Sequence, residues 1–130
     1  MLSGNCRGSN NASCVKARHI FLTGQPAVGK TTLLCAVATE LISLGLNVGG
    51  FFTEERRSPG GNRTGFDVVS LCGERGRLAS LGNRPPVVGK YAVDVSSFEA
   101  VALKAMSAKV NMPLLCVDEV GKMELFSAAF

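Results

Sequence analysis

One stretch, residues 24–32, constrains this chain more than any other: Gly-Gln-Pro-Ala-Val-Gly-Lys-Thr-Thr. It follows the pattern of glycine, any four residues, glycine, lysine and then serine or threonine. An apolar run, residues 19–22, precedes it, and a long segment with helical spacing follows it. A strand, a glycine-rich loop and a helix in this order are typical of a backbone that surrounds phosphate groups.

The residue types in this stretch suit phosphate chemistry. Small residues let the backbone approach phosphate oxygens, and a helix beginning near Lys30 would direct its positive end toward them. The Lys30 ammonium can reach the β- and γ-phosphates, and the Thr31 hydroxyl can bind an accompanying Mg²⁺. The structural alternative is a glycine turn with a chance lysine. The expected nucleotide-binding residues here are Gly24, Gln25, Pro26, Ala27, Val28, Gly29, Lys30, Thr31 and Thr32.

The composition indicates one ordinary domain. The chain has 130 residues, of which 46% are apolar, and this is enough for a hydrophobic core. The net charge is +4 without a basic run, so we expect no nucleic acid partner. No apolar run approaches the roughly 18 residues of a membrane span, so we expect no membrane partner either. A monomer is expected.

The cysteines favour a reducing compartment. There are five, an odd number, and none forms a C-x-x-C pair: Cys6, Cys14, Cys35, Cys72 and Cys116. Cys35 and Cys116 lie in apolar runs, where cysteine behaves as a small hydrophobic residue. A disulfide framework or a zinc site is therefore not expected, and we predict a cytoplasmic location.

Residues 1–17 are predicted to be a flexible leader, and residues 18–130 the folded domain. The leader is rich in Ser, Asn and Gly and shows no hydrophobic periodicity. It contains Arg7 and Lys16 and no acidic residue, as transit peptides do, but it lacks an amphipathic stripe.

Hydrophobic patterning predicts strands and helices in alternation. Residues 19–22 are predicted to be a buried parallel strand, in which His19 has a structural role. The segment after the glycine loop has one apolar face at helical spacing, which predicts a helix, and Gly45 is suited to end this helix. That face is Leu33, Leu34, Val37, Leu41 and Leu44. Hairpin strands are predicted at residues 46–53, 64–71, 78–81 and 90–93.

The last third is predicted to be helix, strand and helix. Ser96-Ser97-Phe98-Glu99 forms a capping box, and the helix it opens ends near residues 111–113. Residues 114–117 are a buried strand, and residues 122–130 a final helix. The buried face of the first of these helices is expected to be Phe98, Val101, Ala102, Ala105 and Met106.

An apolar strand followed by Asp118 and Glu119 is the pattern commonly called Walker B. Asp118 would lie beside Thr31, and we expect these two residues to hold Mg²⁺. Glu119 could orient or deprotonate an attacking water, which makes Glu119 and Lys30 the expected catalytic residues. The structural alternative is a strand end that meets solvent.

Together these segments resemble the THEP1-type nucleoside triphosphatases. The resemblance runs from Arg18 to about Phe126, and its most specific part is the Gly-Lys-Met-Glu that follows Asp118-Glu119. The matching segments are residues 18–24, the glycine loop, and residues 50–55, 65–69, 91–94 and 117–126.

The resemblance implies an α/β P-loop NTPase fold of the RecA/AAA-like branch. This is a three-layer sandwich with a mostly parallel sheet and an inserted antiparallel hairpin region. It implies slow, Mg²⁺-dependent hydrolysis of nucleoside triphosphates with broad base tolerance. By motif position Asp118, Glu119 and Lys122 would lie near the nucleotide. Arg63 and Glu54 are candidates for closing over it, with a solvated turn as the alternative.

The chain departs from this family in three ways. Ala27 stands where the family usually has glycine, and its methyl group could obstruct a loop with positive φ. The leader has no counterpart in short family members. Family members also continue further, and a later strand lies between their equivalents of residues 19–22 and 114–117. We therefore expect a truncated chain without its C-terminal strands. Either strands 19–22 and 114–117 pair directly, or the gap between them stays open and weakens the domain. If these strands do not close, Thr31 and Asp118 would lie too far apart to share Mg²⁺ well.

Two other functions stay open at this point. One is a truncated, non-catalytic nucleotide-binding module. The other is a nucleotide or nucleoside kinase, although no arginine-rich lid is obvious in the sequence.

Overall fold

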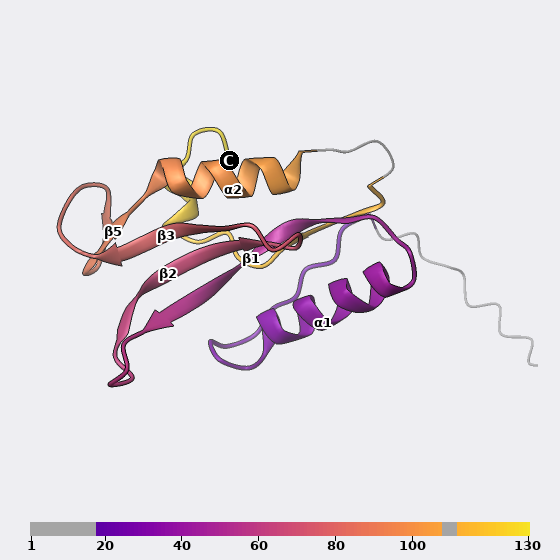
Figure 1. Ribbon diagram of the computed structural model, residues 1–130, viewed down its shortest axis with the longest axis horizontal. Coiled ribbons are helices and arrows are strands. Elements are labelled where there is room, and N and C mark those ends of the chain that lie inside the picture. Colours follow the sequence, from indigo (N-terminus) through magenta and orange to yellow (C-terminus); the bar gives the residue numbers. More distant parts are fainter. Residues whose placement is uncertain (1–17, 108–111) are drawn as a thin grey trace, which may run out of the picture.

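The computed structural model describes residues 18–107 and 112–130. The predicted leader, residues 1–17, lies outside them. Two helices enclose one sheet in three layers: α1 (Lys30–Ser43) covers one face and α2 (Val95–Met106) covers the other (Figure 1). Among the described residues, no helix is long and apolar enough to cross a membrane.

The sheet has six strands in the order β4-β5-β3-β2-β1-β6. Predicted hairpin strands are confirmed, with bounds that shift by a few residues. The strands are β1 (Val48–Arg57), β2 (Arg63–Ser70), β3 (Arg75–Leu81), β4 (Val87–Val88), β5 (Tyr91–Val93) and β6 (Leu114–Val117).

The sheet is mixed, which corrects the expectation of a mostly parallel one. Within the described residues β1 and β6 are the only parallel neighbours, and every other pairing is antiparallel. Short turns can join only antiparallel neighbours, and short turns connect β1 through β5. The segment expected to be an insert therefore makes up most of the sheet.

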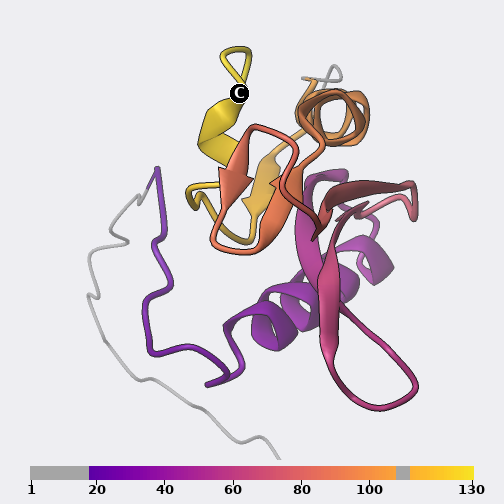
Figure 2. The ribbon, with the colours of Figure 1, turned by 90° about the vertical axis from the view of Figure 1, so that its left-hand side faces the viewer.

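The predicted first strand, residues 19–22, is wrong. This segment forms no strand in the described structure, and Ile20 and Phe21 are each 87% exposed. Figure 2 shows it as irregular chain apart from the sheet. A buried parallel strand needs paired neighbours for its backbone groups. Along residues 18–107 and 112–130, the edge strand β6 pairs with β1 alone, so the backbone groups of residues 19–22 have no strand partner.

Helix α1 is confirmed, and Gly45 ends it as predicted. Gly45 has a φ of +83°, its N–H donates to the Ile42 carbonyl at 2.9 Å, and the Leu46 N–H donates to the Leu41 carbonyl at 3.0 Å. This is the Schellman arrangement. The predicted apolar face is only partly buried. Leu34 and Leu41 pack beside Ala38, Val48 and Cys116, whereas the exposed members are Leu33, Val37 and Leu44.

Helix α2 begins two residues earlier than the predicted capping box. Asp94 is the N-cap, and its Oδ1 accepts a hydrogen bond from the Ser97 N–H at 3.0 Å. Aspartate is a strong N-cap residue, and here it stands three residues before Ser97, the spacing that a cap requires. Phe98, Val101 and Ala102 are buried as predicted.

The predicted final helix, residues 122–130, is also wrong. Within the described residues this segment contains one 3₁₀ turn, η1 (Glu124–Phe126). The Glu124 carboxylate accepts a hydrogen bond from the Gly121 N–H at 2.9 Å, and the Leu125 N–H donates to the Gly121 carbonyl at 3.2 Å. These bonds close a single turn directly after Glu119.

Gly50 sets the distance between β1 and β6. It pairs with Cys116, has a φ of +120°, and a Cβ atom here would lie 1.8 Å from the Cys116 carbonyl oxygen. Only glycine permits this approach. The ladder ends where the Asp118 N–H donates to the Phe51 carbonyl at 3.2 Å, so Asp118 lies beside the middle of β1.

The core lies between the sheet and α2. Phe51 has no exposed surface, and its ring contacts the rings of Phe98 and Phe130 edge-on, with centroids 5.7 and 5.8 Å away. Such contacts add about 0.5–1.5 kcal/mol each to the gain from burial.

We expect Phe51→Ala to lower the free energy of unfolding by about 3–5 kcal/mol, because it leaves a cavity under α2. Urea denaturation followed by circular dichroism measures this. Phe21→Ala is the matched control, since its ring is 87% exposed, and it should change stability by less than about 0.5 kcal/mol. Equal effects of the two substitutions would contradict this account of the core.

Candidate functional site

A cavity of about 720 Å³ lies where the glycine loop, β1, β2 and the end of β6 meet. Because β1 and β6 are parallel, chain segments that follow or continue them meet at the same edge of the sheet. The cavity is lined by Leu22, Thr23, Gly24, Pro26, Ala27, Gly29, Lys30, Thr31, Thr32, Thr53, Glu55, Phe66, Asp118, Glu119 and Val120.

The loop turns through two residues with positive φ. Gly29 has a φ of +104° and Ala27 a φ of +61°. The methyl group of Ala27 therefore does not prevent this conformation, but it costs about 1–2 kcal/mol relative to glycine.

The first turn of α1 opens into the cavity. Gly29 is its N-cap, and in the described structure no side chain caps this turn and no acidic residue lies in it. The free N–H groups and the positive end of the helix dipole together favour an anion. Lys30, Thr31 and Thr32 all line the cavity from this turn.

The Lys30 ammonium folds back over the loop. Its Nζ donates to the carbonyl oxygens of Gly24 and Gln25 at 2.8 and 2.7 Å.

Thr31 and Asp118 are in direct contact, although residues 19–22 are outside the sheet. The Thr31 hydroxyl lies 2.8 and 2.9 Å from the two carboxylate oxygens of Asp118. In the described structure residues 19–22 and 114–117 do not pair, so the expectation that Thr31 and Asp118 would then lie too far apart is wrong. The physical reason is that β6 pairs with β1, and α1 packs on β1, so neither residue depends on residues 19–22 for its position.

The other predicted residues divide into two groups. Glu119 is exposed and lines the cavity, and Gln25 contributes its carbonyl group to Lys30. Lys122 and Val28 are exposed and are not among the described residues that line the cavity.

The predicted closing residues, Glu54 and Arg63, are held in ion pairs, one between β1 and β3 and one between β1 and β2. Glu54 bonds to Arg75 at 2.7 Å. Arg63 pairs with Glu55, and its guanidinium carbon lies 5.5 Å from the centre of the Phe66 ring. Glu55 and Phe66 line the cavity, whereas Arg63 and Glu54 do not belong to its described lining.

Sequence reasoning missed Thr53, Glu55 and Phe66. A signal existed for Thr53, because it ends the predicted strand 46–53 and the ends of parallel neighbours meet at one edge. Glu55 and Phe66 face each other across the hairpin, in a register that the turn between β1 and β2 sets. No local pattern gives that register.

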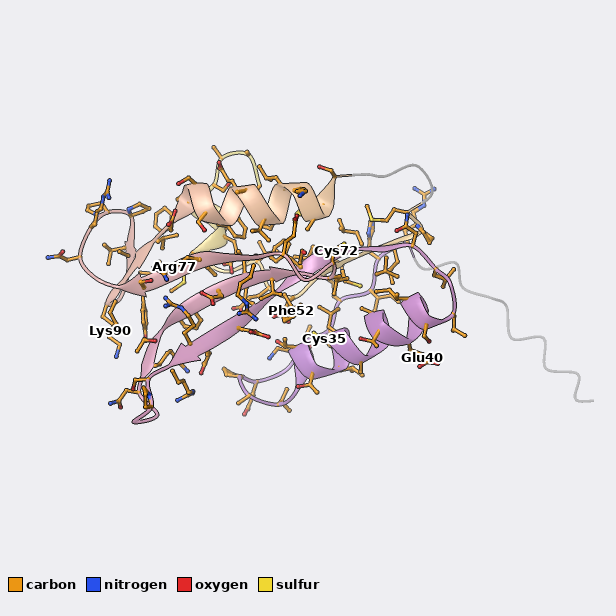
Figure 3. All side chains as sticks on the ribbon, viewed as in Figure 1. Cys35, Glu40, Phe52, Cys72, Arg77 and Lys90 are labelled. Carbon is orange, nitrogen blue, oxygen red and sulfur yellow. The ribbon has the colours of Figure 1, made fainter. Side chains whose placement is uncertain are left out.

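Two thiols lie close to the site and stay protonated. Burial, and then the nearby Asp118, raises the pKa of Cys35, and burial raises that of Cys116. Figure 3 shows Cys35 on the side of α1 toward the sheet, while Glu40 points away from it. These thiols therefore act as small hydrophobic groups rather than as nucleophiles.

Glu124 is a buried carboxyl group behind the site, with a 4% exposed surface. Burial raises its pKa above the ordinary 4.5, and the neighbouring charges of Glu119 and Asp118 raise it further. Folding therefore favours the protonated form of Glu124.

Comparison with known proteins gives consistent matches. Residues 19–130 match the family model described as NTPase. The chain is 49% identical over 125 residues to the cancer-related nucleoside-triphosphatase of Homo sapiens, covering 88% of this chain and 65% of that protein. It is 44% identical over 112 residues to nucleoside-triphosphatase THEP1 of Pyrococcus abyssi, covering 85% and 62%.

A solved structure matches as well. The solution structure of a human cancer-related nucleoside triphosphatase gives a TM-score of 0.68 at 49% identity, covering 85% of this chain and 64% of that one. The mixed sheet with its two helices therefore resembles a solved member of this group, and the resemblance to THEP1-type proteins is confirmed. The chain spans slightly less than two thirds of the length of these relatives.

We expect Glu124→Gln to flatten the dependence of stability on pH. The raised pKa of Glu124 means that its contribution is fully present below pH 4.5 and is lost as pH rises through the raised value. Glutamine can still accept the Gly121 hydrogen bond but does not ionise. Thermal unfolding between pH 4.5 and 8 should therefore show a smaller loss of stability in the variant.

The exposed Glu40 provides the control for this prediction. Glu40→Gln makes the same change of charge at an exposed position on the outer side of α1, and it controls for the loss of one negative charge. A Glu124→Gln variant whose stability falls with rising pH as steeply as that of the wild type would show that Glu124 does not govern this dependence.

Proposed function

The chain belongs to the NTPase family, and from this premise we propose that it hydrolyses nucleoside triphosphates to diphosphate and phosphate with Mg²⁺. The contact of 2.8 Å between Thr31 and Asp118 carries the proposal. It joins a hydroxyl group on α1 to a carboxylate after β6 in one cavity. Hydroxyl and carboxylate oxygens are hard ligands of the kind that Mg²⁺ prefers.

We interpret the glycine loop as a phosphate-binding P-loop, or Walker A motif. The uncapped first turn of α1 offers N–H groups, and Lys30 would exchange the carbonyl oxygens of Gly24 and Gln25 for phosphate oxygens. In this position Lys30 stabilises the charge that develops during phosphoryl transfer.

Thr31 and Asp118 would hold Mg²⁺, and Asp118 would act as the Walker B carboxylate. The Thr31 hydroxyl donates to Asp118, and its oxygen would be available as a ligand of the ion. When bound, the ion neutralises charge on the phosphate oxygens. Glu119 lines the same cavity and is proposed to orient and deprotonate the attacking water.

Other residues take part in this proposal less directly. Arg63 would close over the nucleotide after leaving Glu55, and Glu54 after leaving Arg75. Lys122 is proposed to lie near the nucleotide. Slow turnover and broad base tolerance belong to the proposal, whereas the cytoplasmic location, the monomeric state and independence of nucleic acid stay predictions.

One observation favours a second candidate, a nucleotide-binding module without turnover. Ile20 and Phe21 are exposed and residues 19–22 lie outside the sheet, so the loop is anchored from its helix side. Thermal stabilisation by nucleotide without phosphate release would identify this function. A kinase would instead transfer phosphate to an added acceptor faster than to water.

We expect Lys30→Ala to reduce phosphate release by about 100-fold or more, because a positioned charge on the transferred phosphate is lost. Phosphate release from ATP and GTP at saturating Mg²⁺ measures this. Lys104→Ala is the matched control, since Lys104 pairs with Glu74 on the surface of α2, and it should keep wild-type turnover. Unchanged turnover in Lys30→Ala would refute the assignment of the loop.

We expect Glu119→Gln to lower turnover by about 100-fold while nucleotide affinity stays the same, because glutamine cannot accept the proton of water. Single-turnover hydrolysis and binding of a fluorescent nucleotide separate the two quantities. Glu40→Gln controls for the loss of one charge. If the Glu119→Gln variant hydrolysed nucleotide at the wild-type rate, the group that deprotonates water would have to be another residue.

A further inference from the structure

The Asp118 carboxylate is held by β1 as well as by α1. Thr53 approaches its Oδ2 atom twice, through the main-chain N–H and through the side-chain hydroxyl, each at 3.3 Å. The Thr31 hydroxyl approaches the same carboxylate from α1. Donors from two separate elements therefore fix one side chain.

The β1–β6 pairing explains why Thr53 has this position. The main-chain N–H of Asp118 continues the parallel ladder by donating to Phe51. The next N–H of β1 that points toward β6 belongs to Thr53, and it donates to the carboxylate of Asp118 instead of to a carbonyl group. Asp118 is thus attached to β1 through both its main chain and its side chain.

The hydroxyl of Thr53 adds something that the fold does not require. The N–H of any residue at this position would continue to donate to Asp118, and valine has nearly the same shape as threonine. The hydroxyl lies beside the carboxylate and inside the cavity, since Thr53 is one of its lining residues. Its removal would leave Oδ2 with one donor fewer and Asp118 freer to rotate.

We propose that Thr53 is a positioning residue for Mg²⁺, whose hydroxyl fixes the Asp118 carboxylate in the orientation that receives the ion. This inference rests on the proposed function and extends it to the β1–β2 hairpin. Hydrogen bonds to a ligating carboxylate orient it, and their loss typically lowers metal affinity about 10- to 100-fold. Thr53 acts through Asp118, so the requirement for Mg²⁺ changes while the chemical step does not.

Thr53→Val tests this directly. Mg²⁺ is titrated into protein with ADP, and the rise in melting temperature gives the concentration of Mg²⁺ for half-maximal stabilisation. We expect this concentration to increase about tenfold, at the lower end of the range for such partners. Phosphate release from ATP should show the same shift, with kcat at saturating Mg²⁺ close to wild type. ADP binding in EDTA should be equal in both proteins.

Two variants make the result specific to the hydroxyl group. Thr53→Ser restores the hydroxyl and should return the Mg²⁺ requirement to within about twofold of wild type. Thr64→Val removes a hydroxyl from the same hairpin that donates to the Arg56 carbonyl at 3.2 Å, and it should leave the requirement unchanged.

The outcomes separate this inference from the proposed function. A wild-type protein that responds to Mg²⁺ and a Thr53→Val variant that responds identically would overturn the inference alone. So would a Thr53→Ser variant that behaves like Thr53→Val, because packing would then be the cause. A wild-type protein with no response to Mg²⁺ in either measurement would overturn the proposed function and the inference together.

Discussion

The parallel pairing of β1 with β6 is the constraint on which the candidate site depends. It is possible because Gly50 lets the two backbones approach where any side chain would meet the Cys116 carbonyl. This pairing ends at Asp118 and brings it to Thr53 on one side and Thr31 on the other. Since α1 packs on β1 as well, a single strand positions both halves of the site.

The charges around the cavity are separated in a way that suits a nucleotide with its metal ion. Asp118 and Glu119 follow β6 and face the cavity, and both act on the buried Glu124 behind them. The open first turn of α1, whose Thr31 contacts Asp118, and the Lys30 ammonium supply the positive groups at the same cavity. A cation beside the carboxylates and an anion beside the helix would neutralise the negative and the positive groups at once. Mg²⁺ bound to a triphosphate offers one charge of each sign.

The errors of sequence reasoning have a common physical origin. The composition of residues 19–22 is that of a buried strand, but a strand also needs a neighbour, and its neighbours are set by the whole sheet. The final helix fails because the chain becomes extended at Ser127, whose hydroxyl donates to Glu99 of α2. The capping box at Ser96 fails because the helix already begins at Asp94, two residues earlier, whose carboxylate accepts the hydrogen bond of the Ser97 N–H.

The sequence by itself determined the local elements of this protein. The glycine loop with its following helix, the hairpins and the strand that delivers Asp118 depend on short-range patterns of glycine, polarity and hydrophobic spacing. Tertiary structure alone decided that the sheet is mixed, that Thr31 touches Asp118 without residues 19–22 in the sheet, and that Glu55 and Phe66 line the cavity. These features depend on strand order and register. Both arise from contacts between residues far apart in the chain, so no short segment of the sequence predicts them.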